Sequence, residues 1–265
     1  MAFSGLAPAV RAFDAIAEDF DARFTPWRSV EAQRRAVRAA LIDAFPFGSR
    51  LIEVGGGTGE DGLWLASHGR DVLMTDASPA MVAVAAGKGV RAAVATAEAF
   101  DTFADELAGE PRFDGAYSVF AGLNCVSDLS AFGEGIARLL RPGAPLMLVL
   151  FGTFCPGEIV TEMLRGRPRN AFRRFRRGDV PARLGGRGFM VRYHHRRDLQ
   201  RMLAPSFRLK SRRGIGIFVP PSAAEPWISN HPSLLKALEM LDRLTDRPLA
   251  ILGDHVLYRF ERTGA

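Results

Sequence analysis

The chain has 265 residues, 48% of them apolar, and only two cysteines. This length suits one α/β domain with additions, and two cysteines are too few for a disulfide-based fold or a cysteine-rich zinc site, so we expect no metal. No run of about eighteen apolar residues suggests a membrane-spanning helix, and the first twenty residues lack the pattern of a signal peptide. We therefore expect a cytoplasmic protein.

The net charge is +6, and most of the excess positive charge lies in one part of the chain. Thr153 to Arg213 contains seventeen Lys and Arg residues and four acids. A charge run of this kind is most often a solvated surface. Arginines also bind acidic or phosphorylated small molecules and the phosphate backbone of nucleic acids, and all three interpretations stay open.

Two amphipathic helices are predicted before the first strand. Apolar residues recur at helical spacing between Val10 and Phe20, so the first twenty residues are expected to form one helix. A second helix is expected to begin with Ser29 as its N-cap and to end before Pro46.

The segment from Arg50 to Gly59, RLIEVGGGTG, combines a short apolar run with a glycine-rich turn. It predicts a buried parallel strand followed by a turn that lets a ligand approach the backbone closely. The turn is expected to open onto a helix, whose free N–H groups favour a negatively charged ligand. Glu53 lies inside the strand, where an unpaired carboxylate is costly to bury, so we expect it to have a cationic or donor partner.

A second strand is predicted from Asp71 to Asp76, which places an acid at the carboxyl end of the strand. In a βαβ unit an acid at this position can accept hydrogen bonds from both ribose hydroxyls. The dinucleotide fingerprint has the spacing GxGxxG, from which the order GGGTG departs.

These motifs resemble those of the class I S-adenosylmethionine-dependent methyltransferases. The segment EVGGGTG resembles the family's ExGxGxG signature, and DASPAM, Asp76 to Met81, resembles its D-x-S-x-x-M turn. The resemblance implies that Glu53 contacts the amino-acid part of the cofactor, that Asp76 binds the ribose and that Met81 packs by the adenine. It also implies an α/β fold with a doubly wound, Rossmann-like, mostly parallel seven-stranded sheet.

In the resembled family the segment before the first strand often folds over the cofactor as a lid and carries a YD pair. Here the pair is Phe20-Asp21, with a phenylalanine in place of the tyrosine. The alternative is that these helices only cap the sheet. A third strand, Arg91 to Thr96, is followed by Ala97 and Glu98, which resemble the family's turn beside the adenine, with Thr96 where an aspartate is common.

The fourth strand is predicted from Phe113 to Phe120 and runs into a loop that contains Asn124. Ligands bind at the carboxyl ends of strands in open α/β sheets. Phe120 and Asn124 are therefore our candidates for the methyl-transfer mouth, the opening of the site where the acceptor would meet the methyl group. Packing in the core is the alternative for Tyr117, Phe120 and Cys125.

A helix from Leu129 to Leu140 and a strand from Pro145 to Phe151 follow, and the string LLRPGAPLMLVL resembles the family's turn before its fifth strand. The alternation of strands and helices up to Gly152 is typical of a doubly wound sheet.

The next segment does not continue this alternation. A helix is expected through Glu158 to Leu164, and Gly185-Gly186 predicts a hairpin within Val180 to Tyr193. An alternating strand at 207–211, a helix at 234–244 and a strand at 256–260 then fit a closing antiparallel pair. The expected organisation is a lid (1–48), a cofactor-binding core (49–152), a basic acceptor-side insert (153–200) and the end of the core sheet (201–265).

Methyl transfer from a sulfonium requires mainly the alignment of acceptor and methyl group. A base helps when the acceptor is an oxygen or an acidic carbon, and neutral imidazole suits this role. His194 and Tyr117 are the candidate catalytic groups, and Tyr193 and His195, with Asn124, are the candidate acceptor contacts. Exposed histidines at a helix start are the alternative for His194 and His195.

The cofactor expected from the resemblance is S-adenosyl-L-methionine, with S-adenosyl-L-homocysteine as product. The residues implied to bind it are Phe20, Glu53, Gly55, Gly56, Gly57, Thr58, Gly59, Asp76, Ala77, Ser78, Met81, Thr96, Ala97, Glu98 and Phe120.

The expected function is methyl transfer to a small-molecule acceptor of a natural-product or lipid-like kind. Two alternatives stay open: a nucleic-acid methyltransferase that uses the basic insert, and a non-catalytic protein that only binds the cofactor. The sequence contains no NPPY or DPPY signature of amino-methylating enzymes, which argues against nucleic acid. A nicotinamide or nucleotide-sugar enzyme fits the glycine spacing less well.

Overall fold

A seven-stranded sheet forms the centre of the computed structural model, which describes residues 7–24, 26–120 and 122–264. The strand order is β3-β2-β1-β4-β5-β9-β8. The strands are β1 (Arg50–Val54), β2 (Asp71–Asp76), β3 (Ala92–Val94), β4 (Gly115–Ser118), β5 (Pro145–Phe151), β8 (Phe207–Ile215) and β9 (His255–Arg262). The first five are parallel, and β9 runs antiparallel between β5 and β8. The predicted doubly wound, mostly parallel seven-stranded sheet is confirmed.

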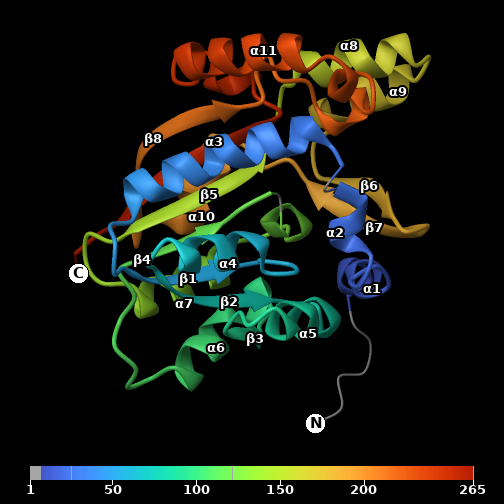
Figure 1. Cartoon of the computed structure of the whole chain (residues 1–265). Coiled ribbons are helices and arrows are strands. Elements are labelled where there is room, and N and C mark those ends of the chain that lie inside the picture. Colours follow the sequence, from blue (N-terminus) through green and yellow to red (C-terminus); the bar gives the residue numbers. More distant parts are fainter. Residues whose placement is uncertain (1–6, 25, 121, 265) are drawn as a thin grey trace.

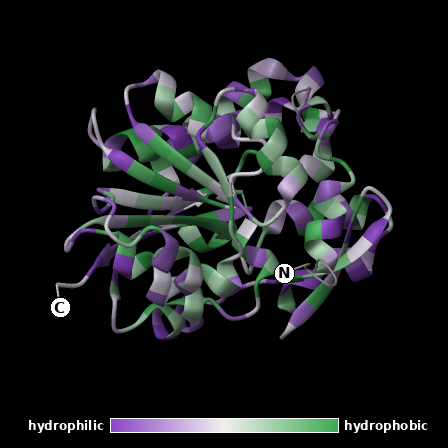
Figure 2. Cartoon of the chain, turned by 90° about the horizontal axis from the view of Figure 1, so that it is seen from below, coloured by the Kyte–Doolittle hydropathy of each residue, from purple (hydrophilic) through white to green (hydrophobic). Residues whose placement is uncertain are grey.

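Helices cover both faces of this sheet, because successive strand residues point to opposite sides. Ile52 faces a core that α6, α7 and α10 complete, whereas Leu51 faces a core formed with α3 and α4. The strands at the centre of Figure 2 are accordingly mostly hydrophobic, and the surrounding helices are mixed. The α-helices between α2 and β5 and after β7 are α3 (Arg28–Ala44), α4 (Glu60–Ser67), α5 (Pro79–Gly87), α6 (Phe100–Glu106), α7 (Ser130–Leu139), α10 (Arg196–Leu203) and α11 (Pro232–Thr245).

The N-terminal segment differs from the sequence-based expectation in two places. The expected helix over the first twenty residues is instead two short helices, α1 (Pro8–Asp14) and α2 (Phe20–Phe24), separated by turns, and its first six residues lie outside the described part. Ser29 is not the N-cap of α3, because Trp27 holds that position. Ser29 is buried in the first turn, where its N–H and hydroxyl both donate to Oε1 of Glu225, at 3.0 and 2.6 Å.

The segment after β5 forms its own small structures. It contains α8 (Pro156–Leu164), α9 (Pro168–Ala171) and the hairpin of β6 (Asp179–Leu184) and β7 (Arg187–Arg192). Gly185 and Gly186 have φ values of 55° and 80°, which only glycine adopts readily, and they form the tip. The predicted hairpin is confirmed. The short 3₁₀ helices of the chain are η1 (Ala97–Ala99), η2 (Gly122–Cys125), η3 (Arg173–Phe175), η4 (Ser222–Ala224), η5 (Ile228–Asn230) and η6 (Ala250–Leu252).

The carboxyl ends of the parallel strands point toward the N-terminal helices and the hairpin. In Figure 1, α1, α2, β6 and β7 stand together at the right, at the end to which β2 and β5 point. Within the described ranges, no helix combines the length and the apolar character needed to cross a membrane.

Candidate functional site

The glycine turn after β1 has the geometry expected for a ligand cradle. Gly55, Gly57 and Gly59 all have positive φ values, of 70°, 58° and 78°. A β-carbon on Gly57 would meet no described atom within 4 Å, so the turn faces open space at this residue. The last of the three glycines is the N-cap of α4, which directs the free N–H groups of that helix toward the turn.

Asp76 lies at the carboxyl end of β2, directly beside this turn. Its Oδ2 accepts a hydrogen bond from the Gly57 N–H at 2.8 Å, and its Oδ1 accepts one from the Ser78 N–H at 2.8 Å. Burial raises the pKa of Asp76, while these two N–H groups oppose the rise. The structure therefore brings the predicted ribose acid and the predicted cradle together.

Glu53 is completely buried at the end of β1. Among the described residues, neither of its carboxylate oxygens makes a hydrogen bond of regular geometry. Burial first, and then the charge of Asp61, raises the pKa of Glu53 well above its usual value, and the nearby Tyr117 hydroxyl acts in the opposite direction. The partner expected for Glu53 is thus not found as a hydrogen bond or an ion pair among the described residues, although the Tyr117 hydroxyl lies nearby.

This arrangement also changes the interpretation of Tyr117. The side chain is fully buried and packs 6.0 Å from the ring of Phe45. Burial and the charge of Glu53 raise the pKa of Tyr117 well above its usual value. A phenol that stays protonated inside the core cannot accept a proton from an acceptor, so Tyr117 is a core residue beside Glu53 and not a catalytic base.

The N-terminal helices are fastened to the cradle by two aspartates. Asp21 accepts a hydrogen bond from the Thr58 hydroxyl at 2.6 Å and forms an ion pair with Lys88 at 2.5 Å. The side chain of Asp14, at the end of α1, accepts hydrogen bonds from the Ser78 hydroxyl and from the Ala80 N–H.

The predicted adenine side lies under these helices. Met81 is buried against residues of α1, α2 and the turns between them, and Phe20 packs against the same cluster. Ala97 is buried in η1, preceded by a half-buried Thr96 and followed by an exposed Glu98. Ala77 is half-buried between Asp76 and Ser78, and Gly56 leaves no room for a β-carbon because Met74 and Glu53 lie too close.

The loop after β4 closes the site from the other side. The backbone of Gly122 lies against Gly55, since a β-carbon on Gly55 would be 3.4 Å from the Gly122 Cα. Burial, followed by the charges of Asp76 and Glu98, raises the pKa of Cys125 to about 12. The loop, the end of β2 and the turn at η1 therefore converge on one place.

Two residues of this loop were predicted to form the methyl-transfer mouth, and their environments differ. Phe120 has a positive φ of 53°, which is rare for a non-glycine residue and marks strain at this loop. Its ring lies 5.6 Å from that of His255. Asn124 has no exposed surface and bonds the backbone at both amide ends, to the Arg192 carbonyl and the Phe151 N–H. Asn124 thus anchors the hairpin to β5 and presents no surface to an acceptor.

The residues at the end of the hairpin also lie elsewhere than expected. His194 is buried, and its Nε2 lies 2.9 Å from the Val126 carbonyl. Burial lowers the pKa of His194. The Nε2 nitrogen of His194 is thus occupied by a backbone carbonyl, whereas no described residue forms a hydrogen bond with Nε2 of His255, so His194 is not retained as the base. Tyr193 is buried beside Phe151, at 5.9 Å between rings, and His195 is exposed at the start of α10.

The sequence analysis missed His255, which begins β9 and lies opposite Phe151 in the register. Its ring stacks on Phe151 at 5.0 Å, and its Nδ1 lies 3.1 Å from Oε1 of Gln33. An amide oxygen can only accept, so Nδ1 carries the proton and Nε2 is left with its lone pair. Nε2 makes no hydrogen bond to a described residue, and burial lowers the pKa of His255 against the opposing charge of Asp254.

The arginines of the insert are partly used inside the protein. Arg174 is 4% exposed and pairs with Glu158 at 2.5 Å and with Asp254 at 2.6 Å. Arg173 binds the same glutamate at 2.8 Å. Arg176 and Arg177 are exposed. Arg174 therefore holds the insert to the residue before β9, Arg173 is paired within the insert, and neither is free to bind a phosphate backbone.

Comparisons with known proteins agree with this geometry. Residues 51–143 match the family model described as a methyltransferase domain. A search of curated proteins found no significant match.

Solved structures resemble the chain over most of its length. An S-adenosylmethionine-dependent methyltransferase from Mesorhizobium loti is 19% identical, with a TM-score of 0.53 over 87% of this chain and 98% of the other. One from Methanosarcina mazei is 18% identical, with a TM-score of 0.55 over 84% and 96%. The DhpI complex with SAH is 19% identical, with a TM-score of 0.52 over 97% and 96%. At these identities the likeness concerns the fold.

Proposed function

We propose that the chain is a class I methyltransferase that uses S-adenosylmethionine and methylates an oxygen or nitrogen of a small molecule; the match of residues 51–143 to the methyltransferase-domain model supports this. The observation that carries the proposal is the position of His255, a neutral base beside Phe120 at the edge of the sheet where the cradle lies. A natural-product or lipid-like intermediate is the proposed class of acceptor.

The residues around the glycine turn fit the cofactor. The open space at Gly57 provides room for a ligand against the backbone, and the Asp76 carboxylate lies beside it, where ribose hydroxyls would replace the Gly57 N–H as partner. Glu53, a buried carboxylate with unfilled hydrogen-bonding capacity, is the proposed contact toward the amino-acid part. The bound cofactor supplies an electrophilic methyl group.

The contact between the N-terminal helices (the lid) and the hairpin of the insert supports the proposal of a small-molecule acceptor. The rings of Phe13 in α1 and Phe189 in β7 lie 5.9 Å apart, and the hairpin tip at Gly185 lies against Ile16. The lid is fastened to the cradle and the hairpin to the loop after β4, so together they wall the carboxyl edge of the sheet. A walled site excludes water and aligns a compact acceptor.

His255 is the proposed general base. Gln33 fixes its tautomer, and Gln33 itself donates to Asp254 at 3.3 Å, so the orientation of the ring is set by a chain of side chains. The free Nε2 accepts the proton that an oxygen or nitrogen acceptor loses when it is methylated. Phe120 and Phe151 hold the imidazole between them.

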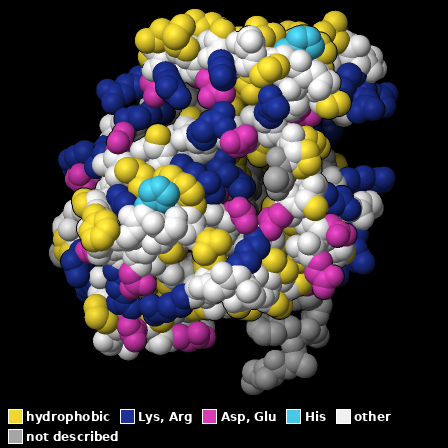
Figure 3. All heavy atoms as spheres, in the orientation of Figure 1, with side chains coloured by type: hydrophobic (Ala, Val, Ile, Leu, Met, Phe, Trp, Pro, Cys, Tyr) yellow, Lys and Arg dark blue, Asp and Glu magenta, His cyan; other side chains and the backbone are white. Residues whose placement is uncertain are grey.

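The two alternatives have weaker support. Figure 3 shows Lys and Arg side chains interspersed with acidic and hydrophobic ones, without an unbroken basic band on this face. Together with the internal pairing of Arg173 and Arg174, this disfavours a nucleic-acid substrate. A protein that only binds the cofactor would have no need of a neutral base at the mouth.

The test is a methyl-transfer assay with radiolabelled S-adenosylmethionine and three separate acceptor pools: small-molecule extract, total RNA and protein. We expect label in the small-molecule pool, and a large loss of it with His255→Gln. Label in RNA would assign the nucleic-acid alternative. Binding of S-adenosylhomocysteine without transfer to any pool would assign the non-catalytic one.

A further inference from the structure

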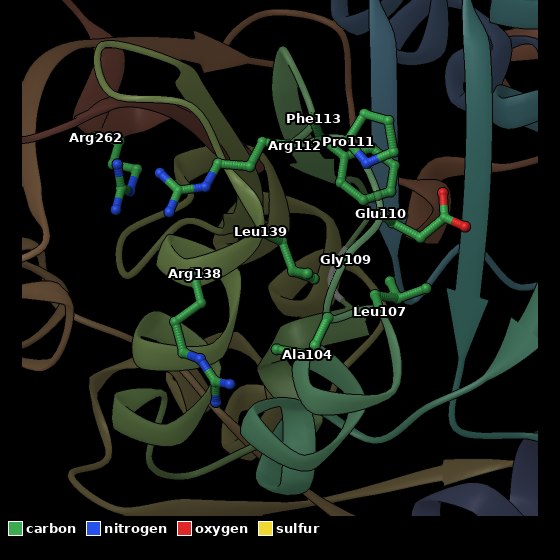
Figure 4. Close-up of a pocket in the computed structure, with 11 residues that line it drawn as sticks. Ala104, Leu107, Gly109, Glu110, Pro111, Arg112, Phe113, Arg138, Leu139 and Arg262 are labelled. Atoms are coloured by element: carbon green, nitrogen blue, oxygen red, sulfur yellow. The ribbon is translucent and has the colours of Figure 1, made fainter.

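A cavity lies at the opposite edge of the sheet from the glycine turn, near the C-terminal end of β9. It has a volume of about 320 Å³ and lies between the loop after α6, the end of α7 and the end of β9. Arg112, Arg138 and Arg262 contribute to its wall, and Leu107 and Phe113 provide an apolar part (Figure 4). Nothing in the methyl-transfer site uses these residues.

Arg262 is unusual among the arginines of the chain. Its Nε and Nη1 are inaccessible to solvent and have no hydrogen-bond partner among the described residues. Burial lowers the pKa of Arg262, and the positive charge of Arg112 lowers it further. In Figure 4 the guanidinium groups of Arg112 and Arg262 lie next to each other. Two like charges therefore lie close together, and two buried donors of Arg262 lack an acceptor in the described part of the chain. Both features destabilise the protein when no ligand is bound.

The acids nearby do not neutralise this pair. Glu110 lines the cavity, but its Oε2 is bonded to Arg50 at 2.8 Å. Arg138 turns its guanidinium away from the other two, and pairs with Asp105. The positive charge of Arg112 and Arg262 is consequently uncompensated among the described residues.

We propose that this cavity binds the phosphate group of a small molecule through Arg112 and Arg262. Guanidinium groups bind phosphate oxygens with paired, charge-assisted hydrogen bonds, and a dianion would neutralise the two like charges of Arg112 and Arg262. The cavity is larger than a phosphate group requires, and its apolar wall at Leu107 and Phe113 suits an organic part of the ligand. The site is separate from the one that holds the cofactor.

The test uses inorganic phosphate and phenyl phosphate as probes, titrated calorimetrically into the full chain at constant ionic strength. We expect both to bind, with phenyl phosphate tighter because its ring reaches the apolar wall. Arg112→Gln and Arg262→Gln should each weaken binding by about tenfold or more. The matched control is Arg259→Gln, which removes an exposed arginine from the same strand outside the cavity.

Thermal unfolding separates this role from a structural one. Without phosphate, Arg262→Gln should unfold at the same temperature as the wild type or higher, since it removes a half-buried charge that has no counter-ion among the described residues, and phosphate should no longer raise that temperature. Equal phosphate binding by wild type, Arg112→Gln and Arg262→Gln, or no binding by the wild type, would overturn the proposal. A single-stranded RNA that displaces phenyl phosphate and binds far more tightly would assign the site to nucleic acid instead.

Discussion

The Nδ1 nitrogen of His255 lies 3.1 Å from the amide oxygen of Gln33, residues that are 222 positions apart in the chain. This contact connects the helix before the first strand with the start of the last strand. It fixes the proton on Nδ1 and leaves Nε2 as an acceptor at the proposed mouth. Several predictions about the reaction depend on it or on the cradle nearby.

Replacing His255 with glutamine should lower kcat by about 10²–10⁴-fold, the usual contribution of a general base. Burial lowers the pKa of His255, so the neutral form prevails at pH 7 and activity should fall only as the pH drops below about 6.5. The measurement is kcat against pH, with the acceptor found in the labelling assay. His195→Gln, an exposed histidine, is the control. If His255→Gln kept the wild-type rate and still lost activity as the pH fell, another group would be the base.

Replacing Asp76 with alanine should weaken S-adenosylhomocysteine binding by about 1–3 kcal/mol, the value of hydrogen bonds to a charged group. Calorimetric titration measures this change. Asp71→Ala removes an exposed carboxylate from the other end of the same strand and should leave the affinity unchanged. Equal affinities of the two variants would contradict the assignment of Asp76 to the ribose.

A methyl group added at Gly57 should occupy the space in which we place the cofactor. The substitution Gly57→Ala meets no described atom of the protein, but its φ of 58° costs about 1–2 kcal/mol for a residue with a β-carbon. Gly143→Ala imposes similar strain, at a φ of 78° with equally open surroundings, far from the cradle. Both variants should lose similar stability in urea, and only Gly57→Ala should lose cofactor affinity. Tight binding by Gly57→Ala would place the cofactor elsewhere.

The local features of the fold could be predicted from the sequence. The apolar run from Pro145 to Phe151 could be placed as a strand because its residues are buried on both faces. The hairpin at Gly185-Gly186 could be placed because its φ values require glycine. The glycine turn and Asp76 could be found together because their spacing follows from the βαβ unit itself.

Features that depend on distant residues could not be predicted. The expected first helix breaks after Asp14, whose carboxylate binds Ser78 and Ala80, 64 and 66 positions away. Ser29 is not an N-cap because the Glu225 carboxylate satisfies its N–H. His255 showed no motif, and its neighbours come from three separate segments. Only the folded chain brings such residues together.

Replacing Glu53 with glutamine should stabilise the cofactor-free protein at pH 7. The folded-state pKa of Glu53 is raised, so the unfolded chain releases its proton first, and stability falls as the pH rises above about 4.5. Glutamine removes the ionisation of this side chain, so its gain in unfolding free energy over the wild type should be larger at pH 7 than at pH 5. Urea unfolding at pH 5 and pH 7 measures it, with the exposed Glu106→Gln as control. A less stable Glu53→Gln would mean that the carboxylate is well paired.

Replacing Arg174 with methionine should destabilise the fold by about 3–5 kcal/mol, because it leaves the Asp254 carboxylate buried without its arginine and Glu158 with only Arg173. Arg176→Met changes an exposed arginine of the same stretch and should alter the unfolding free energy by less than about 0.5 kcal/mol. Urea unfolding compares the two. Asp254 also accepts a hydrogen bond from the Gln33 amide, which in turn orients His255. Arg174→Met should therefore also lower kcat, because the orientation of His255 becomes less fixed. If the two variants were equally stable, the arginines of the insert would form a solvated surface after all.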